Sequence, residues 1–389
     1  MRALHWQGVE IGGQVRDLYT ARRVSDAPLP GVLAVDMRGY ALWPALINAH
    51  DHLELNHYPR SKFRDVYANA HQWGEDVNAR LGQPPYSDGQ TVPLPDRLFI
   101  GGLKNLLSGA LTVAHHNPLH RPLRRADYPV QVLRRCGWAH SLHFSPDVAA
   151  SYARTPPDVP WIIHLAEGTD AVASAEYKRL KALGCVGSNT VLVHGVGLTP
   201  EDRQDAAQHV RGLIWCPSSN LYLLGQTADV RAWQAAGGRV ALGSDSRLTA
   251  EGDLLDEMRV ALAAGQADAG AVLRMATTDA AAVLGLSDVG SLQPGMQADL
   301  IVTPAGKSPV GLRRADLVLV VREGMPLIGD PEVMARLPHV ETVPAMLDGR
   351  PKAIHVGLAR RIIRCRLQEP GLTLRARPAR RWFFLAQSI

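Results

Sequence analysis

Residues 43–53 read Trp-Pro-Ala-Leu-Ile-Asn-Ala-His-Asp-His-Leu, a short apolar run that ends in two histidines, His50 and His52. A run of this kind is typical of a buried strand. Side chains at positions i and i+2 of a strand lie on the same face, so both imidazoles can bind one cation. A chain with 15 histidines also produces such pairs by chance. The pair therefore indicates a metal site only if further ligands follow along the chain.

Four more short apolar runs follow, each closed by a polar or small residue. They cover residues 161–164, 191–194, 213–216 and 240–245. Their closing residues are 30, 22 and 29 positions apart, which is the length of a strand–helix unit in a parallel sheet. Between and after them, apolar residues at helical spacing predict helices over 254–262 and 272–284, which Gly265 and Gly285 end. This alternation predicts an α/β fold with parallel strands.

Residues with metal and proton chemistry lie where these strands are expected to end. Catalytic groups of a parallel barrel lie at the carboxyl ends of its strands. The residues at such ends are His50, His52, His164, His194 and Asp245, and Glu167 follows His164 by three positions. We therefore expect them to converge on one site.

Both ends of the chain differ from this centre, because they contain short β-like segments separated by glycine and proline. We expect residues 1–42 and 289–389 to form one composite β-sandwich domain around a barrel at 43–288. A chain of 389 residues is long enough for a barrel of about 250 residues and a small second domain.

Composition places the chain among globular proteins, with 46% hydrophobic and 20% charged residues. No apolar run reaches the roughly 20 residues of a membrane span, and the N-terminus lacks the apolar core of a signal peptide. The four cysteines are scattered, as expected for free thiols in a reducing compartment. These features predict a cytoplasmic protein with no membrane partner.

Residues 350–389 contain ten basic side chains and a single acid, Glu369, although the whole chain carries only +5. A basic segment can bind nucleic acid or an anionic membrane. A solvated face or a subunit contact is the favoured interpretation, so we do not expect a nucleic-acid partner. A homo-oligomer stays possible.

The motifs together carry a family resemblance. They are Pro-Ala-Leu-Ile-Asn-Ala-His-Asp-His at 44–52, His-Leu-Ala-Glu at 164–167, Val-His-Gly-Val at 193–196, Cys-Pro-Ser-Ser-Asn at 216–220, Leu-Gly-Ser-Asp-Ser at 242–246 and Gly-Ser-Leu-Gln-Pro-Gly-Met-Gln-Ala-Asp-Leu-Ile-Val at 290–302. In this order the chain resembles the amidohydrolase superfamily, in the branch of cytosine-deaminase-like and triazine-hydrolase-like (chlorohydrolase) enzymes. The resemblance implies a (β/α)8 TIM barrel with a small β-sandwich built from both termini. The residues at 110–150 match this pattern poorly.

The resemblance also implies roles for the residues at the strand ends. His50, His52, His164 and Asp245 are implied as ligands of one divalent metal ion that activates water. Zinc is favoured, with Fe2+ or Mn2+ as alternatives. Asp245 would also accept a proton from the water, Glu167 would move a proton to the substrate, and His194 would polarise the attacking group.

A single metal ion is expected because residues 137–146 offer no lysine or glutamate that could bridge two ions. Lys104 lies in a predicted helix, where we expect a solvated side chain. His57, Trp73 and His115 are candidate substrate-binding residues, since they follow predicted strand ends or could stack on a planar ring. Asn220 is expected to form hydrogen bonds within its loop.

The predicted function is a metal-dependent hydrolase that acts on non-peptide C–N bonds, foremost a deaminase of an amino-substituted heterocycle. The alternatives are opening of a cyclic amide or imidazolone-type ring, and a triazine-type chlorohydrolase. A catalytically silent scaffold is less consistent with the retained polar residues. The substrate itself does not follow from the motifs.

Overall fold

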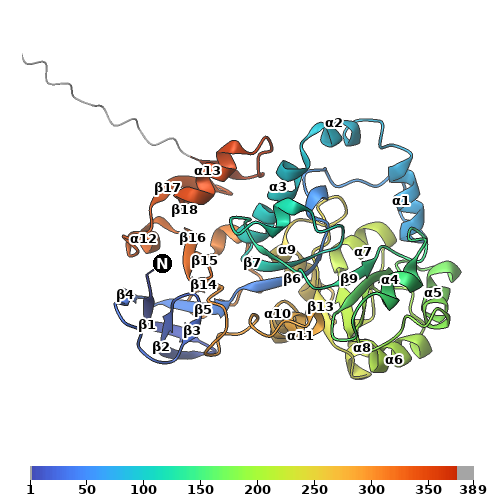
Figure 1. Cartoon of the computed structure of the whole chain (residues 1–389), viewed down its shortest axis with the longest axis horizontal. Helices are drawn as coiled ribbons and strands as arrows, with labels where there is room; N and C mark the ends of the chain where they lie inside the picture. The colour runs from blue at the N-terminus through green and yellow to red at the C-terminus, as the bar shows by residue number, and fades with distance from the viewer. Residues whose placement is uncertain (1, 375–389) are drawn as a thin grey trace, which may run out of the picture.

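The protein, studied as a computed structural model that describes residues 2–374, has a β-sheet domain beside an α/β domain. Figure 1 shows that both ends of the chain contribute to the β-sheet domain, whereas the middle of the chain forms the α/β domain. The two domains meet where strand β5 (Tyr40–Pro44) leads directly into strand β6 (Leu46–Asp51).

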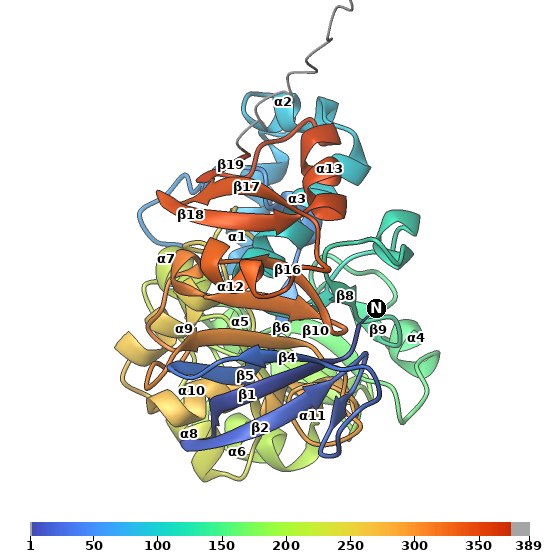
Figure 2. The same ribbon diagram turned by 90° about the vertical axis from the view of Figure 1, so that its left-hand side faces the viewer.

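The β-sheet domain is a single eleven-stranded sheet, and strands from both the N-terminal and the C-terminal part of the chain contribute to it. Its N-terminal strands are β1 (Leu4–Ile11), β2 (Gln14–Thr20), β3 (Val24–Ser25), β4 (Leu33–Asp36) and β5. Its C-terminal strands are β14 (Leu300–Pro304), β15 (Leu319–Arg322), β16 (Met325–Gly329), β17 (Thr342–Leu347), β18 (Arg350–His355) and β19 (Leu372–Leu374). Strands β5 and β14 pair antiparallel, with Trp43 opposite Ile301, and this pair joins the two halves. Figure 2 views this sheet, and the expected composite β domain is confirmed.

Eight parallel strands form the α/β domain in two hydrogen-bonded ladders. One ladder contains β6, β7 (Ala110–His115) and β8 (Gln131–Val132). The other contains β9 (Gly137–Ala139), β10 (Trp161–Leu165), β11 (Thr190–His194), β12 (Gly212–Trp215) and β13 (Val240–Leu242). The backbone N–H of Asp245 donates to the carbonyl of His50 at 3.0 Å, which joins the end of β13 to β6. Within residues 2–374 no ladder connects β8 to β9. The chain thus has the strand order of a (β/α)8 barrel, and the α/β prediction is confirmed.

Helices connect and cover these strands. They are α1 (Ala70–Asn78), α2 (Tyr86–Thr91), α3 (Leu94–Leu107), α4 (Val148–Ala153), α5 (Ala171–Ala182), α6 (Pro200–His209), α7 (Pro217–Leu224), α8 (Val230–Ala235) and α9 (Leu254–Ala263). The helix expected at 254–262 is confirmed as α9. The single helix expected at 272–284 is wrong, because α10 (Ala269–Met275) and α11 (Thr278–Leu284) are separate. The carbonyl of Ala276 accepts a hydrogen bond from the N–H of Ile47 at 2.7 Å, and Thr277 leaves the helical conformation (φ −138°, ψ −100°).

Part of the basic C-terminal segment packs on the rest of the protein. Arg350 and Lys352 in β18 pair with Asp316 and Asp330 at 2.8 and 2.5 Å. The helices here are α12 (Pro331–Ala335) and α13 (Val356–Arg364). The four arginines between residues 375 and 381 lie outside the described residues. Among the helices of residues 2–374, none has both the length and the apolar character needed to cross a membrane.

Candidate active site

The residues expected at strand ends meet around one cavity of about 470 Å³. Its lining includes His52, His164, Glu167, His194 and Asp245. They come from β6, β10 and β11 and from the segment that follows β13. His50 is fully buried below this lining. The carboxyl ends of parallel strands lie at one edge, and this geometry brings together residues that are up to 195 positions apart, from His50 to Asp245.

Imidazole nitrogens and a carboxylate oxygen lie close together in two overlapping groups, His50 with His116 and His164, and His50 with His52 and Asp245. Nε2 of His50 lies 3.1 Å from Nε2 of His164. Oδ1 of Asp245 lies 3.9 Å from Nε2 of His50 and 3.8 Å from Nε2 of His52. Two nitrogens bound to one tetrahedral zinc ion at about 2.0–2.1 Å would be about 3.3 Å apart. The spacing therefore fits a shared metal ion.

The protonation of these histidines fits a metal ion as well. Nδ1 of His164 donates to the carbonyl of His140 at 2.7 Å, so its proton is on Nδ1 and Nε2 offers a lone pair. Burial lowers the pKa of His50 and of His164 well below the usual value, and neighbouring histidines lower both further. The rings are therefore neutral, as metal ligands must be. Among the described residues, Nδ1 of His50 is buried without a hydrogen-bond partner. No hydrogen bond at Nδ1 therefore competes with an ion for this ring.

Glu167 and His194 form an acid/base pair on the cavity wall. Oε2 of Glu167 lies 3.5 Å from Nε2 of His194. Burial, together with the charges of Asp245 and Glu176, raises the pKa of Glu167 well above its usual value. The amide of Asn220 donates to Nδ1 of His194 at 2.9 Å, so the His194 proton is on Nε2 and points toward Glu167. Burial lowers the pKa of His194 to about 4, so the ring is neutral at pH 7.

The backbone is strained at three points around the cavity. Ala166, His194 and Asp245 have positive φ angles of 53°, 74° and 52°. Residues other than glycine rarely adopt this conformation, and strain of this kind concentrates at functional sites. The carboxylate of Glu176, itself 1% exposed, accepts the N–H of Ala166 at 2.6 Å and so supports the turn that carries Glu167.

Lys104 corrects one prediction, because its side chain is completely buried rather than solvated. Nζ of Lys104 lies 2.9 Å from Oδ2 of Asp51, which is also fully buried. The same nitrogen donates to Oγ of Ser244 at 3.2 Å and to the carbonyl of Asp245 at 3.3 Å. The ammonium group is thus part of the support below the histidines, and the sequence pattern of its helix did not reveal this face as buried.

The three candidate substrate-binding residues lie in different places. Trp73 lines the cavity, and its Nε1 donates to the carbonyl of Ser61 at 3.0 Å. His57 packs against Tyr58 with ring centroids 3.9 Å apart and the rings tilted by 40°, and it lines a separate surface pocket. His115 accepts the N–H of Leu53 and is not among the described residues that line the cavity. Strand alternation explains why His115 lies outside the cavity, because the side chains of neighbouring residues in β7 point to opposite sides of the strand.

Two histidines that the sequence analysis did not assign lie beside the ligand candidates. His116 stacks on His164 with ring centroids 4.3 Å apart, and its ring can share an ion with His50 and His164. His140 lines the cavity after β9, and burial lowers its pKa to about 4. His140 has the same sequence signal as the other site histidines, since it follows an apolar strand. That strand, β9, has only three residues. Asn220 was expected to form hydrogen bonds within its loop, but its side-chain amide donates a hydrogen bond to His194.

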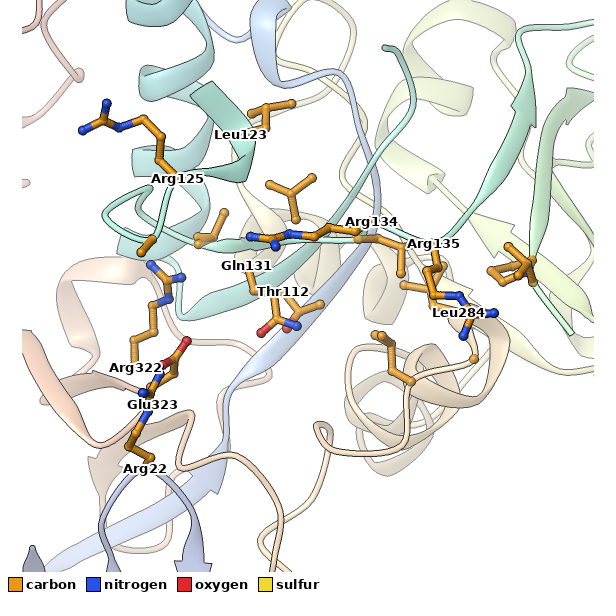
Figure 3. A pocket seen from close by; sticks show the side chains of 18 of the residues that line it. Arg22, Thr112, Leu123, Arg125, Gln131, Arg134, Arg135, Leu284, Arg322 and Glu323 are labelled. Atoms are coloured by element: carbon orange, nitrogen blue, oxygen red, sulfur yellow. Dashed lines mark hydrogen bonds and ion pairs between the residues drawn. The ribbon is translucent and has the colours of Figure 1, made fainter. Parts of the chain in front are cut away.

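A second cavity of about 460 Å³ contains none of these groups. It lies between β7, β8 and the β-sheet domain, and Figure 3 shows its many arginines. Most of these have carboxylate partners: Arg22 pairs with Glu323, and Arg135 pairs with Asp158 at 2.9 Å. The histidine cavity is therefore the candidate reaction site.

Comparison with known proteins supports this assignment. Residues 146–350 match the family model described as the amidohydrolase family. A 5-methylthioadenosine/S-adenosylhomocysteine deaminase of Desulfitobacterium hafniense is 37% identical over 154 residues, which are 36% of this chain and 36% of that protein. The match thus spans about a third of the length of that relative. The deaminase of the same description from Halobacterium salinarum is 27% identical over 74% of this chain and 78% of its own length.

A solved structure agrees with the fold. The atrazine chlorohydrolase of Arthrobacter aurescens, complexed with zinc, superposes with a TM-score of 0.66 at 19% identity and covers 86% of this chain and 99% of its own. The family model covers more than half of the chain, and the ligand-like histidines lie at the strand ends of a shared fold. On this evidence, the chain belongs to the amidohydrolase family.

Proposed function

We propose that the protein is a metal-dependent hydrolase that removes an amino group from a heterocycle and releases ammonia. One observation carries the proposal. At the base of a cavity, His50 lies close to His164, His52 and Asp245, and Glu167, whose pKa burial raises well above its usual value, stands beside them with His194. This arrangement combines a site for a metal ion with a group that can donate a proton, and hydrolytic deamination needs both.

His50, His52, His164 and Asp245 would hold one divalent metal ion, with zinc favoured. Such an ion lowers the pKa of water, so that hydroxide is available at neutral pH. His116 is a further candidate ligand because of its place beside His164. Asp245 is oriented for its role by the Oγ1 of Thr249, which donates to Oδ2 at 3.0 Å, and by the N–H of Ser246, which donates to Oδ1 at 2.7 Å.

The remaining steps follow from the chain's own groups. The raised pKa of Glu167 favours its protonated form, which can give a proton to a ring nitrogen of the substrate and so make the ring carbon more reactive. The Nε2–H of His194 can donate a hydrogen bond to the oxygen that attacks that carbon. Asp245 can accept the proton of the attacking water and pass it to the departing amine. Trp73 is placed to stack on a planar ring.

The deaminase relatives support ammonia release, and the zinc-bound chlorohydrolase supports the alternative of chloride displacement. Both reactions use attack by water on an electron-poor ring carbon. They differ in the leaving group, since an amine must be protonated before it leaves and a chloride need not be. Glu167, whose pKa is raised by burial, can supply that proton, and its presence therefore favours deamination.

The test begins with the metal. His50→Ala should lose stoichiometric metal and activity, as measured by elemental analysis and an ammonia assay. His209, an exposed histidine of α6, gives the matched control, and His209→Ala should keep both. Unchanged metal content in His50→Ala would overturn the ligand assignment.

The acid role of Glu167 is tested separately. Glu167→Gln should retain the metal and lose at least about 100-fold in kcat, because a general acid contributes a factor of this order. The substrates to screen are purines, adenine nucleosides, pyrimidines, pterins, triazines and cyclic amides. Loss of metal in Glu167→Gln would make Glu167 a ligand, and ring opening without ammonia would contradict deamination.

A further inference from the structure

Arg97 is the single lysine or arginine among the described residues that line the active-site cavity. It lies in the first turn of α3. The carboxylates of the lining, Glu167, Glu176 and Asp245, come from the segments that follow β10 and β13. The cavity therefore has a basic group that is separate from its acidic, histidine-rich base.

No carboxylate within residues 2–374 pairs with Arg97 at 4.0 Å or less. Among the described residues, Nε of Arg97 is buried without a hydrogen-bond partner, and the guanidinium hydrogen-bonds the uncharged hydroxyl of Tyr58. Glu54 and Arg97 both lie near His57. The carboxylate oxygens of Glu54, however, contact Asn117 at 2.6 Å and His115 at 3.7 Å. In the second cavity, by contrast, Arg22 pairs with Glu323 (Figure 3), and Arg135 pairs with Asp158. A half-buried guanidinium without a counter-charge is costly, and a bound anion would remove that cost.

The distance between the two ends follows from the helix. Arg97 and Lys104 are seven residues apart in α3, which corresponds to about 10 Å along the axis and to the same helical face. Lys104 reaches the carbonyl of Asp245 at 3.3 Å, so it marks the base of the site. The cavity wall also contains an apolar cluster of Tyr58, Val77, Tyr86 and Leu248. The cavity thus combines one basic side chain, an acidic and histidine-rich base and an apolar wall.

We infer that Arg97 binds an anionic group of the substrate, foremost a carboxylate, at the end remote from the histidines. The inference rests on the proposed function and narrows it to heterocycles that carry a carboxylate remote from the reacting carbon. A planar guanidinium binds a carboxylate through two parallel hydrogen bonds, which also orients the ligand. The apolar wall fits the body of such a molecule, and the ring would lie at the histidines.

A binding measurement tests Arg97 without any turnover. Phenylbutyrate and phenylbutyramide have nearly the same shape and differ in charge. Calorimetry on the metal-loaded protein should show phenylbutyrate binding at least about tenfold more tightly than the amide. Arg97→Gln should abolish this preference. Arg64→Gln, which neutralises an exposed arginine outside the cavity, should retain it. A carboxylate held by the metal would keep its preference in Arg97→Gln, and that result would overturn the inference.

A kinetic comparison then separates this inference from the proposed function. Adenosine and adenosine 5′-carboxylate share one ring and differ at the far end. For the carboxylate, Arg97→Gln should raise KM about tenfold with little change in kcat, and the rise in KM for adenosine should be much smaller. Ammonia release with no effect of Arg97 on either substrate would contradict the inference and leave the proposed function standing. Arg97-dependent binding of phenylbutyrate with no ammonia from any heterocycle would contradict the proposed function alone.

Discussion

At the scale of the residue, the buried pair of Lys104 and Asp51 has the largest predicted effect. Both side chains are fully buried, and Asp51 lies between two ligand candidates. Removing one partner of such a pair leaves an uncompensated buried charge, which costs about 3–5 kcal/mol. We expect Lys104→Met to lower the free energy of unfolding by this amount in urea denaturation and to weaken metal retention, since the chain at Asp51 carries His50 and His52.

Two further variants make this prediction specific. Lys181→Met removes a lysine from an ion pair with Asp205 that is partly exposed, and it should change stability by less than about 1 kcal/mol. The double variant Lys104→Met with Asp51→Asn removes both charges and should regain much of the loss. If Lys104→Met costs no more than Lys181→Met, the buried pair does not have the assigned role.

At the scale of the element, helix α3 is set against the segment after β6 by a close contact. A Cβ on Gly101 would overlap the carbonyl oxygen of Leu53. Gly101→Ala should therefore destabilise the protein although alanine favours helices, and it should displace Arg97 and Lys104. Gly270 in α10 is the control, because its nearest neighbouring atom would be 3.3 Å from the new Cβ. Gly270→Ala should change stability by less than about 1 kcal/mol, because the new Cβ meets no backbone atom closely. Thermal and urea unfolding measure both, and a stabilising Gly101→Ala would contradict the close contact.

At the scale of the whole molecule, Glu369 connects the end of the chain to the active-site segment. Its carboxylate accepts hydrogen bonds from Arg247 at 2.6 and 3.0 Å and from Arg314 at 2.5 Å. Arg247 follows Asp245 by two residues, and its N–H donates to Asn56. The site therefore depends on a residue from the opposite end of the sequence.

Glu369→Gln should lower the free energy of unfolding by about 3 kcal/mol, because two partly buried arginines lose a fully buried charged partner. Amide hydrogen exchange should increase in residues 245–250. Asp158→Asn breaks an exposed pair with Arg135 and should change stability by less than about 1 kcal/mol. Unchanged exchange in residues 245–250 would contradict the proposed link.

Much of the candidate site could be predicted because its chemistry follows local patterns. His50, His52, His164, His194 and Asp245 come directly at or after apolar strands, and parallel strands bring such positions to one edge. Lys104 could not be predicted in this way, since α3 is apolar on several sides and its pattern does not show which polar side chain is covered. The choice between His115 and His116 also depended on the register of β7 with its neighbours.

The sequence by itself determined the α/β class, the composite β domain and the convergence of histidines and acids at the strand ends. These follow from periodicity and from the alternation of strand and helix, which are local properties of the chain. The tertiary structure decided which groups are buried, paired or left without a partner. It placed Lys104 below the histidines, His57 and His115 outside the cavity, and Arg97 in the cavity without a carboxylate. Burial and pairing depend on contacts between residues far apart in the sequence, and no local pattern contains them.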